Sequence, residues 1–162
     1  MLSLQEAAIW ASALRQDNKI VVFTNGVFDL LHPGHIRYLR AARAEGDALI
    51  VAVNSDASVR ANKGPGRPIN PEAERAEVLR ALACVDAVVI FDEETPEAVI
   101  RAIQPDVLVK GADWAKDAIV GRDTVEGRGG RVLRIAIEPG WSSSAIIQKI
   151  QNGRRAEGKG QE

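Results

Sequence analysis

Short apolar runs rich in valine and isoleucine recur along this chain, and a longer stretch with helical periodicity separates most of them. The runs are too short for helices, and strands that are apolar throughout are typical of parallel sheets buried on both faces. The alternation therefore predicts an α/β fold in which helices cover both faces of a parallel sheet of about five strands. We expect these strands at residues 20–24, 49–53, 87–91, 107–109 and 131–137.

Several stretches between and after these runs carry helix signals. From Pro33 to Glu45, apolar residues recur on one stripe, and Gly46 follows as a natural stop. Asn70 and Thr95 each precede a proline, which is the order of cap and first turn that opens a helix. A further helix is expected to begin near residues 142–144.

The two ends of the chain differ in character. Ser3 and Glu6 have the spacing of a capping box for a helix within residues 1–18, which would pack either on the sheet edge or on a second subunit. Residues 153–162 contain no large apolar side chain and are predicted to form a disordered polar tail. We therefore expect a single domain over residues 1–152.

Composition limits the class of partner. The net charge is -1, from 21 basic and 22 acidic residues that are interspersed, so the chain lacks the basic field of a non-specific nucleic-acid-binding protein. No run approaches the ~18 apolar residues of a membrane span, and the N-terminus lacks the layout of a signal peptide. The lone Cys84 lies in an apolar stretch and is expected to be a buried thiol. These features favour a cytoplasmic protein that acts on a small molecule, with neither nucleic acid nor membrane as partner.

The junction between the first expected strand and the helix at Pro33 holds the only two histidines in the chain, His32 and His35. Ligands of parallel α/β sheets bind beyond the carboxyl ends of the strands, where a helix N-terminus presents N–H groups and partial positive charge. Gly34 leaves room for a ligand to approach the backbone there. Two imidazoles beside an anion can donate hydrogen bonds to oxygens on which charge grows during phosphoryl transfer. The segment therefore predicts a phosphate site.

Two other interpretations of the histidines stay open at this point. A histidine at a helix start is often a cap or a surface residue. Two close histidines also occur in metal sites, but zinc takes three or four protein ligands, and the others would here have to be carboxylates. We therefore expect no metal bound by the protein itself.

The segment from Gly26 to His35, with its His-x-Gly-His element, resembles the signature of the cytidylyltransferase-like nucleotidyltransferases. The resemblance extends over residues 19–150 and implies a Rossmann-like fold. It also implies that His32 and His35 contact the nucleotide phosphates and that Lys63 lies in a phosphate-binding loop. These three residues are the expected catalytic groups, although a loop lysine such as Lys63 is otherwise a solvated surface residue.

The same resemblance implies further contacts, each with a plainer alternative. Lys110 and Asp113 stand where the family recognises the nucleotide, but an ordinary turn would suit them as well. Arg75 is either a nucleotide contact or an exposed helix charge. The serines at 142–144 would cap a helix whether or not they meet phosphate. The expected nucleotide-binding residues are Thr24, Asn25, Gly26, Phe28, Gly34, Arg75, Lys110, Gly111, Asp113, Ser142, Ser143 and Ser144.

The expected substrate-binding residues are Asp29, Asn54 and Trp141. Asp29 lies in an apolar run and is expected to orient its loop through backbone hydrogen bonds, while the resemblance also allows a place near the metal or sugar. Asn25 and Gly26 are expected to shape the loop and to pack on the base edge. Trp141 departs from the family pattern, which has a smaller residue there.

Within the family, the segments at residues 51–56, 67–71 and 108–111 resemble a subgroup that makes ADP-D-glycero-β-D-manno-heptose, alone or as one half of a bifunctional heptose kinase. This implies transfer of AMP from ATP to D-glycero-β-D-manno-heptose 1-phosphate, with Mg²⁺ carried by ATP. Ile137 stands where glycerol-phosphate cytidylyltransferases carry an arginine, which argues against CTP. The heptose kinase is expected to be a separate chain and the enzyme a homodimer.

Two alternative functions remain open from the sequence. An enzyme of the same fold could transfer a nucleotide from CTP or ATP to another phosphorylated alcohol, such as glycerol 3-phosphate. A non-catalytic nucleotide sensor would also share the fold, but it has no need to keep both charge-stabilising histidines.

Overall fold

Five parallel strands form one sheet in the computed structural model, which describes residues 1–115, 118–136 and 140–157. The strands are β1 (Val21–Gly26), β2 (Ala48–Asn54), β3 (Ala87–Phe91), β4 (Val107–Gly111) and β5 (Arg131–Ile135), in the spatial order β3-β2-β1-β4-β5. The chain adds β2 and β3 on one side of β1 and then crosses to add β4 and β5 on the other side. In sheets of this kind, ligands bind beyond the carboxyl ends of the two strands that flank the crossing point, here β1 and β4. The predicted parallel α/β sheet is confirmed.

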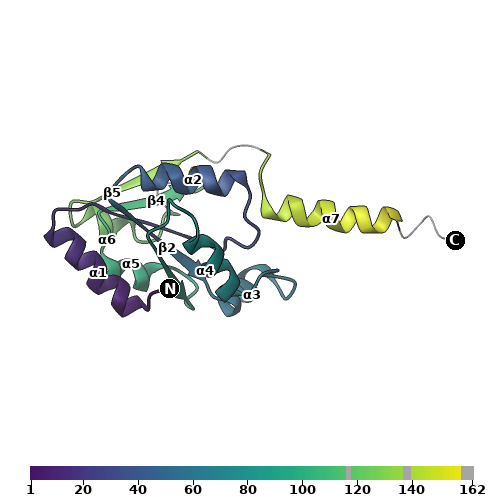
Figure 1. The fold of residues 1–162 in the computed structure, drawn as a ribbon, viewed down its shortest axis with the longest axis horizontal. Coiled ribbons are helices and arrows are strands. Elements are labelled where there is room, and N and C mark those ends of the chain that lie inside the picture. Colours follow the sequence, from purple (N-terminus) through teal and green to yellow (C-terminus); the bar gives the residue numbers. More distant parts are fainter. Residues whose placement is uncertain (116–117, 137–139, 158–162) are drawn as a thin grey trace.

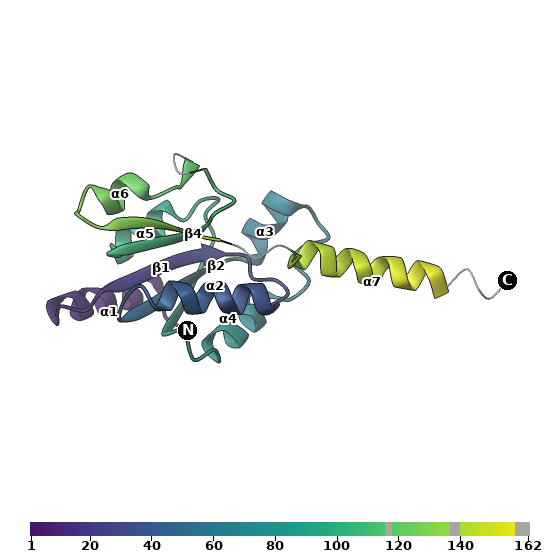
Figure 2. The ribbon, with the colours of Figure 1, turned by 90° about the horizontal axis from the view of Figure 1, so that it is seen from above.

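Helices cover both faces of the sheet, as expected. One face carries α1 (Leu4–Gln16), α5 (Glu97–Ile103) and α6 (Arg122–Glu126), and the other carries α2 (Pro33–Arg43) and α4 (Glu72–Arg80). In Figure 1, α2 lies above the sheet and α1 below it. The remaining helices are α3 (Asp56–Lys63), which follows β2, and α7 (Ser143–Glu157). Figures 1 and 2 both show α7 projecting from the body of the molecule.

Two apolar clusters, one on each side of the sheet, form the core. Phe23 and Ile50 face α1 and α5, while Leu49 and Val51 face α2 and α4, and all four side chains are fully buried. Successive residues of a strand point to opposite faces, so a strand between two helical layers must be apolar at every position. This is why β2, which is buried along its whole length, appears in the sequence as a continuous apolar run.

The N-terminal helix packs on the sheet of its own chain. The expected capping box is present, because the Ser3 hydroxyl accepts a hydrogen bond from the backbone N–H of Glu6 while the Glu6 carboxylate accepts one from that of Ser3. Ala7 and Ala11 are fully buried against the cluster that includes α5. The choice between sheet and second subunit, which the sequence left open, is therefore decided for the buried face of α1.

Two helices begin one residue later than predicted, and two were not predicted. Pro71 and Pro96, not Asn70 and Thr95, are the N-cap residues of α4 and α5. The Asn70 side chain instead donates to the backbone carbonyl of Asp29. The unpredicted helices are α3 and α6, which are short and bury only two residues and one residue respectively, so neither has an apolar stripe to reveal it.

The ends of several elements also differ from the expected ones. β1 continues through Asn25 and Gly26 because both pair with β2. Residues 153–157, predicted as part of a disordered tail, continue α7. Alanine, arginine and glutamate, which occur there, are strong helix formers, so a helix started by the apolar residues before them can continue. Ile137, expected in the last strand, and residues 158–162 of the expected tail lie outside the described residues.

Candidate active site

A cavity of about 480 Å³ opens at the carboxyl ends of β1 and β4. Most of the predicted site residues line it, together with four that were not predicted: Val27, Tyr38, Arg67 and Trp114. The predicted residues brought together here are Asn25, Gly26, Phe28, Asp29, His32, Gly34, His35, Lys63, Lys110, Gly111, Asp113, Trp141, Ser142, Ser143 and Ser144. The segments expected to meet at one site therefore do meet.

The two histidines lie stacked at the start of α2, with ring centroids 3.8 Å apart. His32 is the N-cap residue of α2 but makes no side-chain cap hydrogen bond, so the cap interpretation of this residue is not supported. Within the described part of the chain, neither Nδ1 atom has a hydrogen-bond partner, although both are buried. Buried polar atoms are normally paired, so these two are free to meet a ligand.

Burial also sets the charge of the pair. It lowers the pKa of His32, and burial together with the neighbouring His32 lowers the pKa of His35 to about 4. Both rings are therefore neutral near pH 7, and each can donate one N–H without bringing a charge into the cavity.

Gly34 is required at its position by close packing. A Cβ atom there would lie 3.0 Å from the Trp141 Cβ and 3.1 Å from the His32 Nδ1. The Trp141 ring lies in a stacked orientation 6.1 Å from that of His32. The glycine therefore lets the segment before α7 approach the histidine motif, which was not among the reasons expected for it from the sequence.

On the β4 side of the cavity, Lys110 is a largely buried cation. Its ammonium donates a hydrogen bond to the side-chain oxygen of Asn25 and lies 5.5 Å from the centre of the Trp114 ring. Burial lowers the pKa of Lys110 to about 8, an effect that the nearby Asp113 opposes. A desolvated ammonium of this kind is stabilised strongly when an anion enters the cavity, because the oxygens of a phosphate would replace the lost hydration.

Thr24, which was predicted to bind nucleotide, is fully buried behind the cavity and does not line it. Its hydroxyl shares a hydrogen bond of 2.8 Å with that of Tyr38, which does line the cavity and also donates to the Val109 carbonyl. Thr24 is thus linked to the cavity through Tyr38 and is not part of the lining. A tyrosine within a helix stripe looks like a core residue, which is why the sequence did not reveal it.

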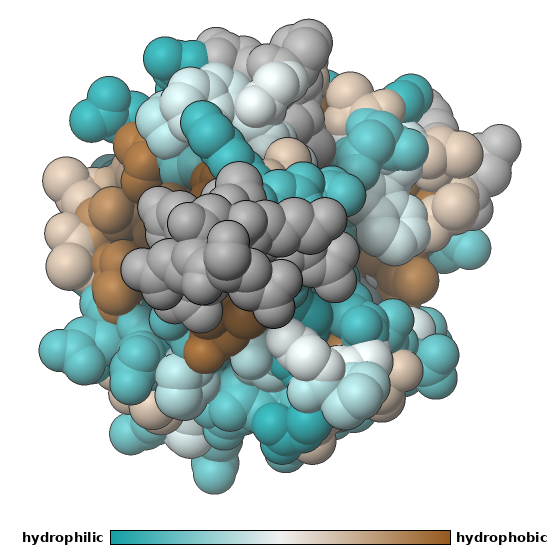
Figure 3. Space-filling view, turned by 90° about the vertical axis from the view of Figure 1, so that its right-hand side faces the viewer, coloured by the Kyte–Doolittle hydropathy of each residue, from teal (hydrophilic) through white to brown (hydrophobic). Residues whose placement is uncertain are grey.

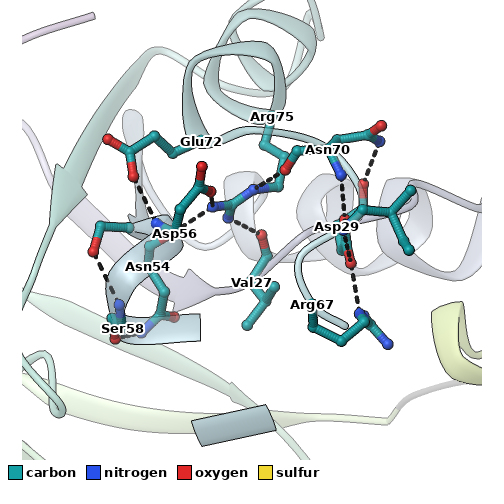
Figure 4. A network of polar contacts seen from close by, with 11 residues as sticks. Val27, Asp29, Asn54, Asp56, Ser58, Arg67, Asn70, Glu72 and Arg75 are labelled. Atoms are coloured by element: carbon teal, nitrogen blue, oxygen red, sulfur yellow. Dashed lines mark hydrogen bonds and ion pairs between the residues drawn. The ribbon is translucent and has the colours of Figure 1, made fainter. Parts of the chain in front are cut away.

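Asp29 links the histidine segment to the loop after α3. Its carboxylate accepts hydrogen bonds from the backbone N–H groups of Ile69 and Asn70 and from the Arg67 guanidinium, at 2.7 to 2.9 Å. Burial alone would raise the pKa of Asp29, but these donors outweigh it and lower that pKa. The expected loop-orienting role is confirmed (Figure 4), and the carboxylate has little capacity left for a sugar or metal.

Arg75 and Asn54 were predicted as ligand contacts, and the structure corrects both. The buried Arg75 guanidinium donates to the backbone carbonyls of Asn70, Val27 and Asn54 and to the carboxylate of Asp56 (Figure 4). It is neither an exposed helix charge nor part of the cavity lining. The Asn54 amide donates to the Ser58 hydroxyl and also lies outside the lining. These polar groups hold the loops around the cavity in place.

The remaining cavity residues come from the end of α3 and the start of α7. Lys63 was expected in a loop but is the last residue of α3. The Ser143 hydroxyl donates to the Leu30 carbonyl, and the Ser142 hydroxyl accepts from the backbone N–H of Ala145. The first turn of α7 is thereby tied to the histidine segment, with its hydroxyls at the cavity.

The donor set of the cavity suits an anion, because Lys63, Arg67 and Lys110 line it together with the two histidines. No group of three or more histidine, cysteine, aspartate or glutamate side chains that could hold a metal ion occurs within the three described ranges.

None of the helices in the described ranges is long and apolar enough to cross a membrane.

Comparison with known proteins agrees with this picture. The cytidylyltransferase-like family matches residues 23–149 of the chain. The bifunctional protein HldE of Mesorhizobium japonicum is 50% identical over 94% of this chain, and that of Citrifermentans bemidjiense is 57% identical over 82%. These matches cover only 31% and 27% of the two relatives, so the chain spans less than a third of their length.

Solved structures resemble the fold as well. A lipopolysaccharide core biosynthesis protein from Thermoplasma volcanium is 31% identical, with a TM-score of 0.61 over 74% of this chain and 97% of that one. A protein of unknown function from Archaeoglobus fulgidus, at 22% identity and a TM-score of 0.56 over 76% of this chain and 93% of that one, shares the fold.

Proposed function

This chain belongs to the cytidylyltransferase-like family of nucleotidyltransferases, and from that premise we propose that it transfers AMP from ATP to D-glycero-β-D-manno-heptose 1-phosphate. In this reaction an oxygen of the sugar phosphate forms a bond to the α-phosphorus of ATP. The bond from that phosphorus to the oxygen of the leaving group breaks, and pyrophosphate departs. The products are ADP-heptose and pyrophosphate.

The observation that carries the proposal is the neutral, stacked pair of histidines at the N-terminus of α2, in a cavity also lined by Lys63, Arg67 and Lys110. Phosphoryl transfer needs donors and cations directed at the oxygens on which charge builds. The two imidazoles would donate to the α-phosphate, and the cations would hold the phosphates of the triphosphate and the leaving pyrophosphate.

No general base is required, because a phosphate monoester dianion is already a competent nucleophile. The task of the protein is then positioning and charge stabilisation. Mg²⁺ would enter with ATP and be held mainly by triphosphate oxygens, since the carboxylate of Asp29 is taken up by Arg67, Ile69 and Asn70.

Support for the heptose acceptor is separate from support for the chemistry. It rests on the subgroup resemblance of residues 67–71 and 108–111 and on the high identity to HldE proteins over most of this chain. Trp141, half exposed at the cavity, would pack against the sugar. Asp113, exposed at the rim, would accept hydroxyl hydrogen bonds from the sugar or the ribose.

The proposal is tested by incubating the protein with each of the four ribonucleoside triphosphates and, in separate reactions, heptose 1-phosphate or glycerol 3-phosphate. We expect pyrophosphate release with ATP, and a product with the mass of ADP-heptose. Release of pyrophosphate only with CTP, or only with glycerol 3-phosphate as acceptor, would assign a different transfer reaction to the same site. Binding of ATP without turnover of any acceptor would indicate a sensor.

A further inference from the structure

Helix α7 leaves the body of the molecule with an apolar face that the described residues cover only in part. Ile146, Ile147 and Ile150 are spaced so that they share one side of the helix; the first two are half-buried, and Ile150 is 52% exposed. Figures 1 and 2 show the helix extending away from the sheet beyond its first turn. A helix with such a face normally buries it against another element.

An apolar groove lies beside the point where α7 begins. Its floor and walls include Leu31, Ile36, Val78 and Leu82, from α2 and α4 and the segments next to them, and its volume is about 540 Å³. Val78 is 51% exposed there. Ser143, at the start of α7, donates to the carbonyl of Leu30, next to the groove residue Leu31. Figure 3, which looks at the molecule from the side on which α7 projects, shows several apolar patches on a mostly hydrophilic surface.

We propose that the α7 helix of a second copy of this chain occupies this groove, and that two copies exchange their α7 helices reciprocally. Each copy carries one partly exposed helix face and one open apolar groove, so a two-fold dimer satisfies both at once and leaves no open end.

The charges at the groove set the orientation of the incoming helix. On α4, the exposed Glu74 lies one turn before the groove residue Val78 and the exposed Glu77 lies next to it, while Arg37 and Arg40 of α2 line the groove. Helical spacing places Lys149 on one flank of the isoleucine stripe and the amide of Gln151 on the other. The helix fits with Lys149 toward the glutamates of α4 and Gln151 toward the arginines of α2.

The reciprocal arrangement also favours a stable interface through its size. Stable protein interfaces bury about 1,200–2,000 Å² in total, and affinity benefits from each additional well-packed contact. Exchange of both helices doubles the buried area. The exchange also holds the first turn of α7, with Ser142 to Ser144, at the cavity of its own chain. The dimer would therefore stabilise the position of these serines in the cavity lining.

Sedimentation equilibrium of the full chain tests the proposal without reference to its catalytic activity. We expect the wild type to sediment at about twice its chain mass of 17.5 kDa. Ile150→Glu and Val78→Glu should each weaken dimerisation by at least ~30-fold, because each places a charge in an apolar contact. Ile9→Glu, which changes an isoleucine of α1 that is 63% exposed, is the matched control and should remain dimeric.

A mixture of the two disruptive variants separates exchange from other forms of association. The Val78→Glu chain keeps an intact helix and the Ile150→Glu chain keeps an intact groove, so the mixture should form mixed dimers more readily than either variant alone dimerises. A monomeric wild type would overturn the proposal, and so would dimerisation unchanged by both substitutions. Binding of a monomeric wild type to vesicles of anionic phospholipid would assign the apolar face of α7 to a membrane surface instead.

Discussion

At the scale of single residues, the central feature is a pair of imidazoles kept neutral by burial. A neutral donor matters little to the free protein, but it matters when negative charge develops on a bound phosphate. The effect of removing one ring should therefore be concentrated in turnover and leave folding largely intact.

We predict that His35→Ala lowers kcat by at least ~10²-fold, a loss of the size seen when one charge-stabilising donor is removed from an active site. His35→Gln, which keeps an N–H donor, should recover part of the rate. The measurement is steady-state pyrophosphate release, with circular dichroism to verify that both variants are folded. Wild-type turnover in a folded His35→Ala protein would contradict the mechanism.

The same pair predicts how stability depends on pH. Since the pKa of His35 is lowered to about 4 in the folded protein from its ordinary 6.5, the unfolded chain binds the proton more readily. The contribution of this residue to stability is therefore complete above the unfolded pKa and is lost as the pH falls from 6.5 toward 4. Urea unfolding should show a weaker pH dependence over this range for His35→Gln than for the wild type. Identical slopes would mean that His35 is not desolvated.

Sequence reasoning worked best for residues whose role is local. His32, His35 and the serines before α7 form motifs in which the neighbours along the chain define the site. Arg75 was misjudged because its partners, the carbonyls of Val27 and Asn54, lie far from it in sequence. Arg67 was missed as a site residue for the same reason, since its pairing with Asp29 joins two distant loops.

At the scale of elements, the Asp29 carboxylate holds the loop between α3 and α4 against the histidine segment. This loop carries Arg67, and Lys63 ends the helix before it, so both cations are placed through the same contact. Loss of the carboxylate should therefore affect stability and nucleotide binding together.

We predict that Asp29→Asn destabilises the fold by about 2–4 kcal/mol, because an amide cannot accept from two backbone N–H groups and Arg67 at once. The KM for ATP should rise more than kcat falls, since the loop cations are displaced but the histidines remain. Asp92→Asn, at an exposed position after β3, is the control and should change stability by less than about 0.5 kcal/mol. Equal stability of Asp29→Asn and wild type would refute the role given to this residue.

The elements themselves were predictable where burial imposed a pattern. All five strands and the helices with an apolar stripe were predicted. The strands of a two-sided parallel sheet form apolar runs, and only β5, at the sheet edge, is interrupted by arginines and partly exposed. Helices α3 and α6 were not predicted, since a short helix that buries one or two residues leaves almost no periodic signal. The continuation of α7 past residue 152 was also missed, because low hydrophobicity does not prevent a strong helix former from extending a helix.

At the scale of the whole molecule, the direction change of the sheet brings β1, β4, α2, α3 and α7 to one cavity. That convergence is what the order of the sequence motifs indicated, and it follows from parallel strands whose carboxyl ends share one edge. The choice of nucleotide and acceptor then depends on the rim of this cavity.

We predict that the protein selects ATP over CTP. The basis is the resemblance of residues 110–113 to the adenylyltransferase subgroup and the presence of Ile137 where cytidylyltransferases carry arginine. Calorimetric titration of the protein with a non-hydrolysable analogue of each nucleotide would show the difference, as tighter binding of the ATP analogue. Equal or tighter binding of the CTP analogue would reverse the assignment of the donor.

The most direct test of the central claim is kcat/KM with ATP for three acceptors: D-glycero-β-D-manno-heptose 1-phosphate, mannose 1-phosphate and glycerol 3-phosphate. Polar groups left unpaired in a site typically cost about 1–3 kcal/mol each, so an acceptor that lacks hydroxyls of the heptose should react at least ~10-fold less efficiently. We predict that the heptose phosphate has the highest value. If either smaller acceptor reacts as efficiently as the heptose phosphate, the heptose assignment is contradicted.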